Sequence, residues 1–160
     1  MSRKNKPGTR LITPDYLYNS QLVSKLINYI MKDGKKSVAT SQVQNVLETF
    51  KKTKKTDDPV SILEQAIDNI KPKVEVRPRR IGGAVYQVPT PVRGNRQLSL
   101  ALRWLVAAAR KRPNKQYHLF HQKLVAELED SLNQQGEAFK KRQDVEKMAE
   151  ANKAFSHLRW

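Results

Sequence analysis

Two histidines are the first candidates for chemistry in this sequence. His118 and His121 stand three positions apart on a predicted helix, so both could lie on one face and bind a metal ion. A zinc site needs three or four ligands, and no carboxylate or third histidine stands at ligand spacing nearby. We therefore interpret both histidines as ordinary polar helix residues and expect no metal or other cofactor.

Nucleotide hydrolysis and nucleophilic catalysis are not indicated either. The pair Gly82-Gly83 lacks the Gly-Lys-Ser/Thr ending of a phosphate-binding loop and does not join a strand to a helix. No arrangement of serine, histidine and acid can be argued from the spacing. The chain has no cysteine, which excludes disulfides and thiolate metal sites and fits a reducing compartment. We expect that the protein is not an enzyme.

Positive charge is the strongest signal in the composition. The 160 residues include 31 Lys and Arg against 15 Asp and Glu, a formal net charge of +16. A charge this large makes a compact chain repel itself, so a polyanionic partner is the simplest explanation. A membrane is a weak candidate, because there is no run of about 18 apolar residues. The first fifteen residues also lack the apolar stretch of a secretory signal. We expect a nucleic acid; a merely soluble basic protein is the alternative.

The segment 71–96 concentrates this charge. Glu75 is its one acid, and its cations are Lys71, Lys73, Arg77, Arg79, Arg80, Arg93 and Arg96. Arginine forks bind phosphate in a bidentate manner and stack on bases. The alternation of Val74 and Val76 with polar residues predicts a strand, and Gly82-Gly83 predicts a tight return. We expect a basic hairpin over 73–91 that projects from the helices and cannot itself be a core. Pro78 lacks an amide, so its strand is expected at an edge. A solvated, flexible hairpin is the alternative.

Helical periodicity accounts for most of the remaining chain. Apolar residues at spacings of three and four predict six helices, of which Asp58-Pro59 begins the third and Pro72 ends it. The other five are predicted over 21–32, 37–52, 96–111, 116–132 and 138–154, and Ser20 can cap the first of these. Val38, Val43, Val46, Leu47 and Phe50 form the expected inner face of the second helix. Residues 51–58 are predicted to be a loop, and 1–18 a flexible basic arm of a single domain that spans 1–160.

Two basic clusters lie at predicted helix ends, and the helix dipole explains only one of them. Arg110-Lys111-Arg112 ends a helix, where cations favour the dipole, so this cluster has a structural explanation. Lys140-Lys141-Arg142 lies near a helix start, where the dipole disfavours cations, and an anionic ligand would explain it. Charge alone does not distinguish RNA from DNA. An architectural DNA-binding protein with a basic β-arm therefore remains the alternative.

Four stretches carry a resemblance to a known family. The segments 25–37 (KLINYIMKDGKKS), 72–89 (PKVEVRPRRIGGAVYQVP), 100–112 (LALRWLVAAARKR) and 140–160 (KKRQDVEKMAEANKAFSHLRW) resemble the universal small-subunit ribosomal protein seven family, in its bacterial and organellar branch. The resemblance implies a mainly α fold, a six-helix bundle with a β-hairpin between the third and fourth helices. It implies a structural protein that nucleates the subunit head on the 3′ major domain of small-subunit rRNA, beside the tRNA exit site and the mRNA exit channel.

The resemblance also implies partners and contact residues. It places on rRNA the residues Arg3, Lys4, Lys6, Arg10, Lys35, Lys36, Arg77, Arg110, Lys111 and Arg112, to which we add Lys73, Arg93, Arg96, Lys115, Lys140, Lys141 and Arg142. It places near exit-site tRNA and mRNA the residues Arg79, Arg80, Gly82, Gly83, Lys153, His157 and Arg159. Small-subunit proteins nine, eleven and thirteen would be neighbours, in the cytoplasm or in an organelle stroma or matrix. The stretch 114–124 is longer than usual for the family, which leaves the start of the fifth helix open.

Overall fold

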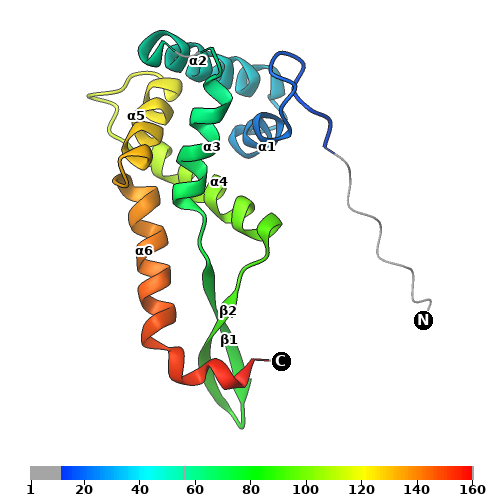
Figure 1. Cartoon of the computed structure of the whole chain (residues 1–160), viewed down its shortest axis with the longest axis vertical. Helices are drawn as coiled ribbons and strands as arrows, with labels where there is room; N and C mark the ends of the chain where they lie inside the picture. The colour runs from blue at the N-terminus through cyan, green and yellow to red at the C-terminus, as the bar shows by residue number, and fades with distance from the viewer. Residues whose placement is uncertain (1–11, 56, 160) are drawn as a thin grey trace, which may run out of the picture.

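The computed structural model describes residues 12–55 and 57–159, in which helices and one hairpin follow in the predicted order. Its elements are α1 (Gln21–Ile30), α2 (Lys36–Lys54), α3 (Pro59–Ile70), β1 (Val74–Ile81), β2 (Ala84–Pro91), α4 (Gly94–Lys111), α5 (Phe120–Leu132), α6 (Gly136–Ala151) and the 3₁₀ helix η1 (Lys153–Leu158). The mainly α fold, with a hairpin between the third and fourth helices, is therefore confirmed (Figure 1). No helix in these described ranges is long and apolar enough to cross a membrane.

Side-chain caps begin two of the helices as the sequence predicts. The Ser20 hydroxyl accepts a hydrogen bond from the Val23 amide at the start of α1. Asp58 Oδ1 accepts from the amides of Val60 and Ser61 at 3.0 and 3.4 Å, and Pro59 occupies the first position of α3. These contacts satisfy amides that have no partner within the helix.

Two helix boundaries differ from the prediction. Helix α2 continues to Lys54, so most of the lysine-rich stretch is helical and not loop; cations suit the C-terminal end of the dipole, and Lys55 ends the helix in the left-handed region at φ 49°. Helix α5 begins at Phe120, four residues after the predicted start. The backbone of Leu119 is extended, and the residues before it form a turn in which the Tyr117 amide donates to the Pro113 carbonyl.

The hydrophobic core lies among the first five helices, with one side chain from the start of α6. Leu102 and Leu105 of α4 are fully buried, and Trp104 packs against the same core from a partly exposed position. The prediction that Val38 faces inward is wrong: its side chain is 57% exposed, and Ala39 is buried instead. Ala39 starts the buried stripe of α2, and Val38 lies about 100° away around the helix.

The hairpin covers nearly the predicted range, over 74–91, and it packs against the C-terminal elements. Ile81 pairs with Ala84, so Gly82-Gly83 forms a two-residue turn at φ 55° and 90°, and Pro78–Ile81 belong to β1. The tip projects beyond the helices (Figure 1). The hairpin contributes no residue to the core cluster of the helices, but Val88 near its base is fully buried. Helix α6 packs beside β1, and η1 packs beside β2.

A buried carboxylate determines where α6 begins. Glu127 of α5 is 1% exposed, and its Oε1 accepts from the Ala138 amide at 2.9 Å. Gly136 enters α6 at φ 90°, and a Cβ at this position would lie 3.0 Å from Glu127 Oε1. The glycine therefore permits both the left-handed turn and the close approach of the carboxylate.

Substitution of a central core residue tests this architecture. We expect Leu102→Ala to lower the free energy of unfolding by about 2–5 kcal/mol, because it leaves a cavity where α4 packs into the core. Urea denaturation followed by circular dichroism measures the change. The control Met148→Ala, at an exposed position on α6, should cost about 0.5 kcal/mol or less. Equal losses in the two variants would contradict a core centred on α4.

Candidate nucleic-acid interface

Arg112 lies inside the protein rather than on its surface. Its side chain is 17% exposed, and its guanidinium donates to Glu127 Oε2 at 2.9 and 2.7 Å and also to the Asp130 carboxylate. Burial lowers the pKa of Arg112, but hydrogen bonds to Asp130 and Glu127 more than offset this, so the pKa is raised. This arginine therefore joins the end of α4 to α5.

Two further arginines of the predicted set support the fold as well. Arg142 Nη1 donates to the Asn69 carbonyl at 2.7 Å, which ties α6 to the end of α3, and its guanidinium lies 4.5 Å from the Phe139 ring centroid. Arg110 Nη2 donates to the Ile30 carbonyl at 3.0 Å. That carbonyl is at the C-terminal end of α1, where a cation is favoured.

Glu75, the one acid of the basic segment, orients two arginines at the base of the hairpin. It is buried, and its carboxylate accepts from Arg77 Nε at 2.6 Å and from Arg96 Nε at 3.2 Å. About half of each arginine side chain remains exposed. Glu75 therefore holds two guanidinium groups side by side, one from β1 and one from α4.

The remaining predicted cations form the exposed surface. Lys35, Lys36, Lys73, Arg93, Lys111, Lys115, Lys140 and Lys141 are all exposed. Lys111 forms an exposed ion pair with Glu137 at 3.4 Å, which contributes little to stability. Lys140 and Lys141 form no ion pair within the part of the chain that the structure describes. The predicted contacts Arg3, Lys4, Lys6 and Arg10 lie outside the described residues.

The structure brings the two predicted exit-site segments together. The hairpin carries Arg79, Arg80 and the tip Gly82-Gly83, while η1 carries Lys153 and His157 beside β2. Rings of Tyr86 and Phe155 lie 5.3 Å apart between centroids and join the two segments. Figure 1 shows the C-terminal segment crossing beside the hairpin. Residues about seventy positions apart therefore form one surface.

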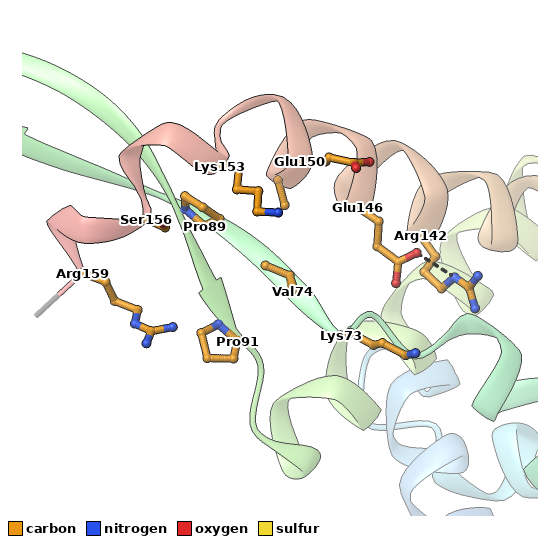
Figure 2. Close-up of a pocket in the computed structure, with 11 residues that line it drawn as sticks. Lys73, Val74, Pro89, Pro91, Arg142, Glu146, Glu150, Lys153, Ser156 and Arg159 are labelled. Carbon is orange, nitrogen blue, oxygen red and sulfur yellow. Dashed lines mark ion pairs between the residues drawn. The ribbon is translucent and has the colours of Figure 1, made fainter.

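A cavity of about 580 Å³ lies between the base of the hairpin on one side and α6 and η1 on the other. Figure 2 shows Lys73, Val74, Pro89 and Pro91 on the hairpin side, with Arg142, Glu146, Glu150, Lys153, Ser156 and Arg159 opposite. Glu146 pairs with Arg142 within α6. Lys73, Lys153 and Arg159 give this cavity an excess of positive charge, which suits an anionic chain.

The two histidines do not share a helix face. His118 precedes α5 in the irregular stretch, and His121 is the second residue of α5. Among the described residues, no group of three His, Cys, Asp or Glu is placed to hold a metal ion.

The sequence prediction missed Glu127, the buried acid that holds Arg112. Glu127 and Ser131 lie on the same face of α5 as the buried Leu124 and Leu128. Because a buried carboxylate rarely lacks a partner, an acid within an apolar stripe indicates that a cation is buried beside it. This pattern was the sequence signal for an internal arginine.

Comparison with known proteins identifies the family. The family model described as Ribosomal protein S7p/S5e matches residues 2–153. The small ribosomal subunit protein uS7 of Pelagibacter ubique is 51% identical over 160 residues, and that of Thioalkalivibrio sulfidiphilus is 52% identical over 160; both alignments cover all of both chains. The same protein of Thermosipho africanus is 52% identical over 159 residues, 99% of each chain.

These matches place the chain in the class of ribosomal proteins, and they confirm the resemblance found in the sequence. The chain belongs to the ribosomal protein S7p/S5e family. It is a structural protein of the small subunit that functions in translation, and it is not an enzyme.

The division between internal and external cations gives a testable contrast. We expect Arg112→Gln to lower the free energy of unfolding by about 3 kcal/mol, because it leaves Glu127 buried without its cation. Thermal unfolding measures the effect. The double variant Lys140→Gln/Lys141→Gln should melt at nearly the wild-type temperature, since both side chains are exposed and form no ion pair within the described residues. Comparable losses in both variants would contradict the division.

Proposed function

We propose that this chain is a primary rRNA-binding protein that nucleates assembly of the small-subunit head on the 3′ major domain of the rRNA. The observation that carries the proposal is the distribution of exposed cations over three separate parts of the fold. They occur at the α1–α2 turn, at the base of the hairpin and at the start of α6. Contacts at several points select a folded RNA over an extended strand.

The support of the hairpin favours a positioned probe over a flexible arm. Its base is held by Glu75 and α6, and its outer half by the Tyr86–Phe155 contact. We place the tip, with Arg79, Arg80, Gly82 and Gly83, at the tRNA exit site and the mRNA exit channel. Lys153, His157 and Arg159 complete this surface from η1 and the residue after it.

The remaining parts of the proposal follow from the family. We assign the chain to a single ribosomal-protein domain, with 1–18 as a basic RNA-binding arm and 73–91 as the hairpin. Small-subunit proteins nine, eleven and thirteen would be its neighbours. The relatives named above are bacterial, which favours the cytoplasm of a bacterium over an organelle stroma or matrix.

Binding to a head-domain rRNA fragment tests the proposal. We expect the purified full chain to bind the fragment with an affinity that falls about 10³-fold between roughly 50 and 200 mM salt, because several phosphates are neutralised. Fluorescence anisotropy of a labelled fragment measures the affinity. Lys140→Gln/Lys141→Gln should reduce the slope against log salt by about two.

Duplex DNA of the same length is the matched competitor. It should displace the rRNA fragment weakly, because it lacks the folded shape and the 2′-hydroxyls that RNA presents. Equal competition by the duplex would refute the ribosomal role and favour an architectural DNA-binding protein.

A further inference from the structure

A second cavity, of about 360 Å³, opens far from the hairpin, between the α1–α2 turn and the start of α5. Its apolar wall includes Val38, Leu119 and Phe120, and its polar edge includes Lys32, Lys35 and Arg110. Among the described residues that line it, none is acidic. Its volume falls at the small end of the range for ligand pockets, roughly 300–1,000 Å³.

Phe120 packs against the core, but the two other side chains of the apolar wall are not explained by folding. Val38 is 57% exposed and Leu119 is 51% exposed, so neither contributes much to the core. Leu119 also occupies the N-cap of α5, where a leucine cannot accept a hydrogen bond from the free amides and a polar residue would stabilise the helix. Two exposed apolar side chains on one cavity, one of them at an unfavourable position, indicate a surface that contacts a ligand.

The polar edge is held in a fixed orientation. Arg110 donates from Nη2 to the Ile30 carbonyl, which anchors the guanidinium at the cavity while its other N–H groups have no partner in the described part of the chain. Gln42 also lines the cavity, and its Oε1 accepts from the His121 amide at 3.0 Å. This bond orients the side chain so that its –NH₂ group, a donor, is left for a ligand.

We propose that this cavity holds one unpaired nucleobase of the bound RNA, with the adjoining phosphate on Lys35 and Arg110; the proposal rests on the rRNA-binding function proposed above. A nucleotide combines a flat apolar face, acceptors on its edge and an anionic phosphate, and the cavity offers a complement to each. The wall of Val38, Leu119 and the Phe120 ring contacts the base face, and the Gln42 amide meets a base acceptor. An acidic peptide helix shares the charge but requires anchors along an extended groove.

Two RNA strands separate base binding from phosphate binding. The probes are a short oligoadenylate and a strand of the same length that has the sugar-phosphate backbone without bases. We expect the wild-type chain to bind the oligoadenylate roughly tenfold more tightly than the abasic strand, as measured by fluorescence anisotropy at low salt. Val38→Ala/Leu119→Ala should abolish most of this preference while its affinity for the abasic strand and its melting temperature stay unchanged.

Met148→Ala is the matched control, because Met148 has a similar exposure on α6 and does not line the cavity. It should retain the wild-type preference. The inference is overturned if the double variant also retains the preference, or if the wild type shows none. It is equally overturned if a peptide of leucine and glutamate binds the wild type more tightly than the oligoadenylate and is lost in the double variant.

The head-domain rRNA fragment distinguishes the two proposals. If the wild type binds the fragment with steep salt dependence but shows no preference for bases, the function stands and the nucleobase site falls. If the wild type does not bind the fragment, both proposals fall.

Discussion

The buried carboxylate of Glu127 is the constraint on which the rest of the structure depends. One oxygen accepts from the amide that begins α6, and the other accepts from the guanidinium of Arg112 at the end of α4. Because both oxygens are used, the end of α4 and the start of α6 meet at one residue of α5. The direction in which α6 leaves the bundle follows from this junction, and α6 in turn supports the hairpin. A charge buried inside a strongly basic protein therefore joins Arg112 and Ala138, which are 26 positions apart in the sequence.

The positive charges of the chain have two different roles. Arg112 and Arg142 form contacts within the protein, whereas Lys140 and Lys141, beside Arg142 in the sequence, face solvent. Arginine suits the internal positions because its fork donates to several acceptors at once, and lysine suits a solvated surface. Glu75 gives an intermediate case, in which a buried acid holds half-exposed arginines in place. The net charge of +16 is thus an incomplete guide to the binding surface.

Local signals allowed the sequence to predict the order of the helices, the Ser20 and Asp58 caps and the Gly82-Gly83 turn, because each depends on residues close in the chain. Features that depend on distant residues were not predicted. The late start of α5, the outward position of Val38 and the burial of Val88 each result from packing between elements. Charge alone identified the exposed lysines of the candidate surface. Glu127 within the apolar stripe of α5 indicated an internal arginine, but only the fold shows that this arginine is Arg112, 15 residues away.

Hydrogen exchange of the Glu127→Gln variant tests the central role of this junction most directly. Glutamine keeps the size of the side chain but loses the charge that holds Arg112. We expect the amides of α6 to exchange faster than in the wild type, by about tenfold or more, while those of α1 keep nearly the same protection under conditions where the fold persists. Unchanged protection of α6, or an equal loss throughout the chain, would contradict the claim that Glu127 positions α6 and the surface built on it.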